Sequence, residues 1–116
     1  MEEPTLTTSI DVDGDKYQIT AVFLENAVSI FIYEDIPRLG TLAISVPGTN
    51  IMQASTLYVT GSTDTYFVRM LGERFATRTS KLVLLSISLK DVTNELIMKI
   101  MQKTEQILFG EKNKKE

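Results

Sequence analysis

Two runs rich in β-branched residues flank a short acidic turn near the start of the chain. Residues 5–12 (TLTTSIDV) and 16–25 (KYQITAVFLE) are separated by Asp13, Gly14 and Asp15. Asp-Gly between two such runs is a strong hairpin signal, because glycine adopts a positive φ without steric cost. The pattern therefore predicts two antiparallel strands.

The next run, residues 27–34 (AVSIFIYE), is apolar on both faces. Successive side chains of a strand point to opposite sides of the sheet. Phe31 and Tyr33 therefore share one face, and the other face holds Val28, Ile30 and Ile32. Such a strand is either central in a sheet covered on both sides or has one face free for a partner. The sequence leaves both interpretations open.

Turn residues separate two further strands. Pro37 and Gly40 interrupt the chain before residues 41–46 (TLAISV), where large apolar and small residues alternate. Pro47-Gly48 makes another turn, and residues 51–59 then indicate a more polar strand.

Beyond residue 62 the apolar positions recur at helical spacing. The spacing predicts a helix that ends near residues 78–80, with Ser62 or Thr63 as its N-cap. Residues 81–89 (KLVLLSISL) indicate an apolar strand, and Asp91 is expected to cap a second helix that ends at Gly110. The apolar positions of the two helices are Phe67, Met70, Leu71 and Phe75, then Leu96, Ile97, Ile100, Met101, Ile107 and Leu108.

The order of these elements is βββββαβα, with no repeated βαβ unit. It predicts an α+β fold: a mostly antiparallel sheet of about six strands with two helices packed to one side. A chain of 116 residues has the length of one domain, so we expect residues 1–116 to form a single domain. The basic stretch at about residues 111–116 is expected to be a frayed tail.

The composition removes the commonest catalytic and metal-binding side chains. The chain has no histidine and no cysteine, which excludes histidine-based triads, thiolate zinc sites and disulfides. Asp11, Asp13 and Asp15 superficially match a calcium loop, but Gly14 stands at the fourth loop position, where an EF-hand needs glycine at the sixth. A polar hairpin turn explains these residues, so we expect no enzyme activity, no cofactor and no metal.

The net charge and the N-terminal sequence do not favour nucleic acid or a membrane as the binding partner. Twelve basic and fifteen acidic residues give a formal charge of −3, which does not favour nucleic-acid binding. The N-terminal sequence MEEPTLTTSI lacks the basic and apolar regions of a secretory signal, and no segment has the roughly 20 apolar residues of a membrane span. We expect a cytoplasmic or nuclear protein that binds neither nucleic acid nor membrane.

Residues 61–89 (GSTDTYFVRMLGERFATRTSKLVLLSISL) resemble the corresponding region of the proteasome assembly chaperone 4 family. In that family a short Gly/Asp/Ser/Thr turn opens a helix, which is followed by a basic-Thr segment and an apolar strand. The preceding SIFIYEDIPRLGTLAISVP resembles the strand, loop and strand of the family, so the similarity covers roughly residues 27–108. The matching positions are Leu71-Gly72, Phe75-Ala76, Arg78-Thr79, Lys81 and Val83.

The resemblance implies a non-enzymatic chaperone and its partners. Members of this family pair with a homologous sister subunit, proteasome assembly chaperone 3, and dock on an α-subunit of the 20S proteasome during α-ring assembly. Chaperone 3 has a similar fold, so the resemblance leaves both subunit identities open.

Four residues are candidates for partner binding. Phe31 and Tyr33 are nominated by the second apolar face of their strand, and Arg69 and Arg74 by the charged side of the first predicted helix. Another small α+β protein-binding or scaffold module, such as a trafficking or signalling adaptor that uses an open sheet edge, would show the same features. An enzyme that relies on Asp or Glu side chains is the third alternative.

Overall fold

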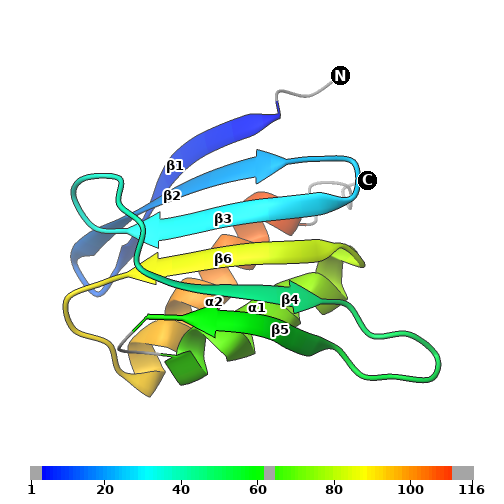
Figure 1. The fold of residues 1–116 in the computed structure, drawn as a ribbon. Coiled ribbons are helices and arrows are strands. Elements are labelled where there is room, and N and C mark those ends of the chain that lie inside the picture. The colour runs from blue at the N-terminus through cyan, green and yellow to red at the C-terminus, as the bar shows by residue number, and fades with distance from the viewer. Residues whose placement is uncertain (1–3, 62–64, 111–116) are drawn as a thin grey trace.

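The computed structural model describes residues 4–61 and 65–110 and consists of a six-stranded sheet and two helices (Figure 1). The element order matches the predicted order. The strands are β1 (Thr5–Val12), β2 (Asp15–Phe23), β3 (Ala27–Tyr33), β4 (Thr41–Val46), β5 (Ser55–Thr60) and β6 (Leu82–Ser88), and the helices are α1 (Thr65–Thr79) and α2 (Asn94–Phe109).

The strands lie in the order β1-β2-β3-β6-β4-β5, so the last strand in sequence sits between β3 and β4. β3 and β6 run parallel, and the other neighbouring pairs are antiparallel. This arrangement confirms the predicted α+β class and its mostly antiparallel sheet. β3 lies between β2 and β6 in the interior of the sheet, but the helices of the described chain cover only one of its two apolar faces (Figure 1).

Both helices lie on the same side of the sheet, behind it in Figure 1. α1 packs mainly against β4 and β6, and α2 packs against β1 and α1. The core lies between the sheet and this helix layer. Its largest fully buried side chains include Ile19, Ile30, Ile32, Leu71, Phe75, Leu85, Ile97 and Ile100.

The hairpin between β1 and β2 forms where the Asp-Gly signal predicts it. Asp13 and Gly14 have φ values of 52° and 90°, the left-handed conformation that a two-residue hairpin turn requires. Lys99 of α2 donates to Asp13 at 3.0 Å, and this hydrogen bond raises the pKa of the lysine. The turn thereby connects one end of the sheet to the helix layer.

The contact between α1 and β4 depends on small side chains. A Cβ atom at Gly72 would lie 2.6 Å from Ser45 Oγ, so an alanine at this position would require the Ser45 hydroxyl to move. Ser45 Oγ lies 3.0 Å from Thr56 Oγ1, and the Thr56 hydroxyl donates to Glu73 at 2.5 Å. A chain of polar contacts therefore joins β4, β5 and α1.

Two details differ from the sequence-based expectations. The fifth strand begins at Ser55, not at residue 51, because residues 47–54 form a long loop. The N-cap of α2 is Thr93, whose side chain accepts a hydrogen bond from the amide of Leu96, so the prediction of Asp91 was wrong. The expected cap of α1 at Ser62 or Thr63 and the tail at residues 111–116 lie outside the described residues. No helix within residues 4–61 and 65–110 is long and apolar enough to cross a membrane.

Candidate protein-binding surface

The sheet face turned away from the helices is largely apolar, and we call it the open face. It is defined by strand alternation and by the register between neighbouring strands. In the described part of the chain, both helices cover the opposite face only. The side chains of the four central strands on the open face are Gln18, Thr20, Val22, Ser29, Phe31, Tyr33, Leu42, Ile44, Val46, Leu82, Leu84 and Ser86.

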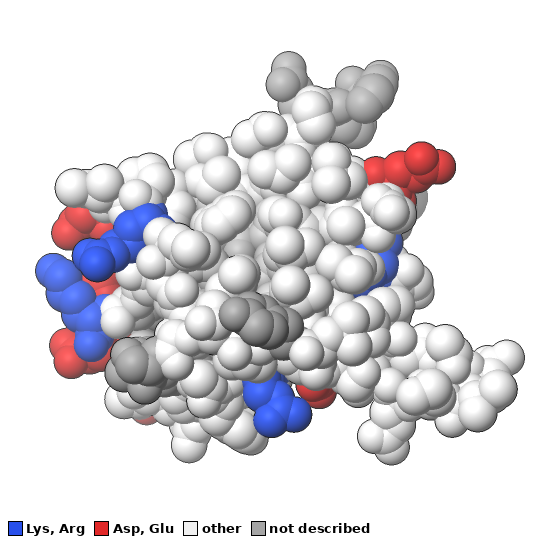
Figure 2. All heavy atoms as spheres, in the orientation of Figure 1, with Lys and Arg blue, Asp and Glu red and all other residues white. Residues whose placement is uncertain are grey.

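The open face also carries little charge. Figure 2 views the molecule from this side and shows the Lys, Arg, Asp and Glu side chains gathered at its margins. Sheets that present one face to water normally alternate apolar and polar positions, with the polar side chains outward. Here Phe31, Leu42, Ile44 and Leu84 are only partly buried and point outward. An uncharged apolar surface with a charged margin is typical of a protein-binding site.

β4 shows how the sequence produces this surface. Its small residues Ala43 and Ser45 face the helix layer, where Gly72 brings α1 close to the sheet. Strand alternation then places Leu42 and Ile44 on the open face. The large apolar residues of β4 are therefore available to a partner because the small ones are needed beneath the helix.

The connection from β3 to β4, residues 34–40, runs across the open face of β6 (Figure 1). A Cβ at Gly40 would collide with the backbone of Ile87, and the Gly40 amide donates to Ser86 Oγ at 2.8 Å. The connection forms a raised border beside a shallow apolar hollow of about 290 Å³. The hollow is lined by Thr20, Phe31, Tyr33, Pro37, Arg38 and Leu39.

The predicted residues Phe31 and Tyr33 both lie in this hollow. Phe31 is partly exposed, whereas Tyr33 is only 3% exposed and its hydroxyl lies 2.7 Å from Thr20 Oγ1. Phe31 is therefore accessible to a partner, whereas Tyr33 is nearly buried in the lining of the hollow. Their binding of a partner remains a prediction.

The predicted residues Arg69 and Arg74 lie elsewhere, on α1 in the helix layer. Arg69 is exposed. Arg74 Nε donates to Glu105 of α2 at 2.8 Å, and Arg78 lies 3.4 Å from the same carboxylate. The structure does not bring the two arginines together with Phe31 and Tyr33. Arg74 has a structural contact of its own, and a role of either arginine in partner binding remains a prediction.

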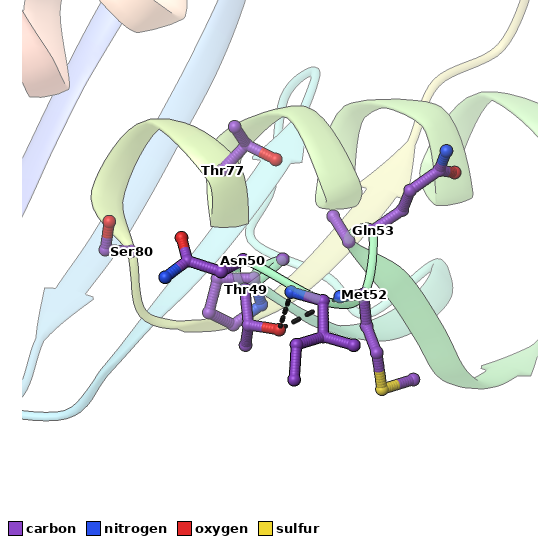
Figure 3. A pocket seen from close by; sticks show the side chains of 10 residues that line it. Thr49, Asn50, Met52, Gln53, Thr77 and Ser80 are labelled. Carbon is purple, nitrogen blue, oxygen red and sulfur yellow. Dashed lines mark hydrogen bonds between the residues drawn. The ribbon is translucent and has the colours of Figure 1, made fainter.

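Sequence reasoning missed a second apolar surface, in the loop between β4 and β5. Ile51 and Met52 are 91% and 67% exposed there. Residues 47–54 of this loop and the end of α1 border a hollow of about 450 Å³ (Figure 3). A signal was available in the sequence, because the chain carries no charged residue from Leu39 to Thr63.

No three Asp or Glu side chains among the described residues are grouped as metal ligands. Tyr17 has a raised pKa, caused by burial and then by the carboxylate of Asp15, but it lies in the core between β2 and the helices.

Comparison with known proteins finds a similarity of fold. No family model and no curated protein sequence matches the chain. A chain in the crystal structure of a novel chaperone complex for yeast 20S proteasome assembly matches with a TM-score of 0.69 and 12% sequence identity. The match covers 90% of this chain and 94% of the yeast chain. This protein therefore shares its fold, over nearly its whole length, with a subunit of a proteasome assembly chaperone complex.

Proposed function

We propose that this protein is a non-enzymatic chaperone subunit that pairs with a homologous sister subunit and assists assembly of the 20S proteasome α-ring. The fold shared with a subunit of the yeast chaperone complex carries the proposal. The resemblance of residues 61–89 to the proteasome assembly chaperone 4 family supports it from the sequence. The protein acts in the cytoplasm or nucleus, where proteasomes assemble.

The open face is the surface that suits pairing with the sister subunit. Six strands spaced about 4.8 Å apart give the whole sheet a width of roughly 24–29 Å, and six residues per strand give it a length of about 20 Å. The resulting area of roughly 480–580 Å² per partner is just below the lower end of the size of standard specific protein interfaces, which is about 600 Å² per partner. A sister subunit of the same fold would offer an equivalent face, so that two sheets stack with their helices outward.

The pairing is tested by co-expression with a chaperone 3-like subunit and size-exclusion chromatography. We expect one heterodimer peak for the wild type. The variants Ile44→Asp and Leu84→Asp place a carboxylate on the open face and are expected to elute as separate subunits, because a buried unpaired charge is costly. Gln102→Asp, on the exposed side of α2, is the matched control and is expected to pair normally.

The docking step is tested with purified α-subunits of the 20S proteasome. We expect the heterodimer to co-elute with at least one α-subunit. A stable monomer that binds neither the sister subunit nor any α-subunit would refute the proposal. Recovery of trafficking or signalling proteins in place of proteasome subunits from a cell extract would favour the adaptor alternative.

A further inference from the structure

One corner of the open face combines an apolar hollow with an unpaired arginine. Phe31 and Leu39 line the hollow of about 290 Å³, and Arg38 is the single charged residue of its lining. Arg38 is exposed, and among the described residues its side chain has neither a hydrogen bond nor an ion pair. The guanidinium group is therefore available for a contact outside the described chain.

The other charged residues around Arg38 already have contacts. Glu34 Oε2 accepts a hydrogen bond from the backbone amide of Lys90 at 2.7 Å, and Lys90 Nζ lies 4.0 Å from Asp35. These three residues and Arg38 line a neighbouring hollow of about 370 Å³. Arg38 lines both hollows and thus lies on the border between a charged and an apolar surface.

The polar atoms in the apolar hollow pair with one another. The hydroxyl of Tyr33 lies 2.7 Å from Thr20 Oγ1, which in turn lies 3.4 Å from Thr7 Oγ1. An apolar group can cover these hydroxyls without leaving a buried polar atom unsatisfied. Arg38, in contrast, offers several N–H donors in a planar arrangement that matches the two oxygens of a carboxylate. The hollow therefore suits an apolar group with a carboxylate beside it.

The size and place of the hollow favour a protein over a small molecule as the occupant. Small-molecule sites usually measure about 300–1,000 Å³ and enclose most of the ligand. This hollow is smaller, shallow, and continuous with the apolar surface of the open face. An arginine beside apolar and aromatic side chains is also a composition typical of the residues that contribute most to protein interfaces.

We propose that the hollow binds a protein surface that presents a leucine-sized apolar side chain next to an aspartate or glutamate. The apolar side chain lies against Phe31 and Leu39, and the carboxylate accepts hydrogen bonds from Arg38. A partner with a lysine or arginine at this position is disfavoured by like charges. The inference goes beyond the proposed function, because it rests on the lining of the hollow and not on the identity of the partner.

The test is an NMR titration of the isotope-labelled full chain with blocked tetrapeptides, acetyl-Ser-X-Z-Ser-amide. The central dipeptide X-Z is Leu-Asp, Leu-Asn, Leu-Lys or Ala-Asp. We expect the Leu-Asp peptide to shift the amide signals of Phe31, Arg38 and Leu39. It is also expected to bind about threefold tighter than the Leu-Asn peptide, the effect of one exposed ion pair.

Variants at exposed positions separate the two parts of the contact. Arg38→Glu is expected to reverse the preference, so that the Leu-Lys peptide binds tighter than the Leu-Asp peptide. Leu39→Ser, at a 64% exposed position, is expected to weaken binding of the Leu-Asp peptide and to retain the fold. Arg69→Glu makes the same charge change at an exposed position of α1 and is the matched control, with no expected effect on either peptide.

Four results would overturn the inference. Equal affinity of the Leu-Asp and Leu-Asn peptides would exclude the contact with Arg38, and equal affinity of the Leu-Asp and Ala-Asp peptides would exclude the apolar contact. Tighter binding of octanoate than of the Leu-Asp peptide would assign the hollow to a small carboxylate. The absence of shifts at the hollow with every peptide would exclude it as a binding site. None of these results depends on pairing with a sister subunit, which the co-expression experiment decides separately.

Discussion

At the scale of single residues, small side chains decide where the helix layer meets the sheet. Gly72 of α1 lies directly over Ser45 of β4, and an added Cβ at 2.6 Å from Ser45 Oγ would require the Ser45 hydroxyl to move. The sequence indicates that α1 is helical, but it does not reveal this contact. A glycine within a helix does not show which residue of another element lies against it. The arrangement can be tested by a double-mutant cycle.

Gly72→Ala is expected to destabilise the protein by about 1–3 kcal/mol, because the added methyl group either displaces the Ser45 hydroxyl from Thr56 or moves α1 away from β4. In a Ser45→Ala background the obstructing oxygen is absent, and the same change is expected to cost nothing or to stabilise by up to about 1 kcal/mol through helix propensity. Urea unfolding of the wild type, both single variants and the double variant measures the coupling. Additive effects of the two changes would contradict the proposed contact.

Glu105 is the second residue whose role depends on the fold. Its side chain is 8% exposed and lies 2.8 Å from Arg74 Nε and 3.4 Å from Arg78. Glu105→Gln is expected to lower the free energy of unfolding by about 1–3 kcal/mol, since it weakens charge-assisted hydrogen bonds at a mostly buried site. Glu95→Gln, at a 79% exposed carboxylate that pairs with Lys99, is the control and should cost less than about 0.5 kcal/mol. If urea unfolding gave the same loss of unfolding free energy for Glu105→Gln and Glu95→Gln, Glu105 would not stabilise the contact between α1 and α2.

At the scale of elements, hydrophobic periodicity predicted the order and type of all strands and helices, because both depend on local patterns. The boundaries that were wrong have local causes that the pattern hides. Ile51 and Met52 suggested the start of a strand, but the hydroxyl of Thr49 stabilises a turn at those positions instead. Thr93, not Asp91, caps α2, and both residues are suitable caps by type.

The burial of the second face of β3 could not be predicted from the strand alone. Whether Phe31 is core or surface depends on where the helices pack, which is a long-range property of the fold. Both helices pack on the other face of the sheet from Phe31 and Tyr33. On the face that Phe31 and Tyr33 share, the connection at residues 34–40 lies beside Tyr33. Two residues with the same pattern in sequence therefore differ in exposure.

The connection across β6 gives a prediction at this scale. Gly40→Ala is expected to destabilise the protein by about 1–3 kcal/mol, because the methyl group would collide with the backbone of Ile87 and lift residues 34–40 off the sheet. Pro37→Ala, at an exposed position of the same connection, is the control and should have a smaller effect. Thermal unfolding measures both. Equal stability of Gly40→Ala and the wild type would show that the connection does not need this close approach.

At the scale of the whole molecule, the distribution of charge distinguishes an apolar interface on the open face from an interface made by charged residues elsewhere. The charged side chains lie at the margins of the open face, and its centre is apolar (Figure 2). If the sister subunit covers this face, most of the binding free energy comes from the burial of apolar area, which salt does not screen.

We therefore expect the dissociation constant of the heterodimer to change by less than about threefold between about 0.1 and 1 M NaCl. Isothermal titration calorimetry at both salt concentrations, with Leu42→Ser as a variant expected to weaken binding at each, measures it. A strong loss of affinity at high salt would place the interface on charged residues such as Arg69, and would contradict pairing through the open face.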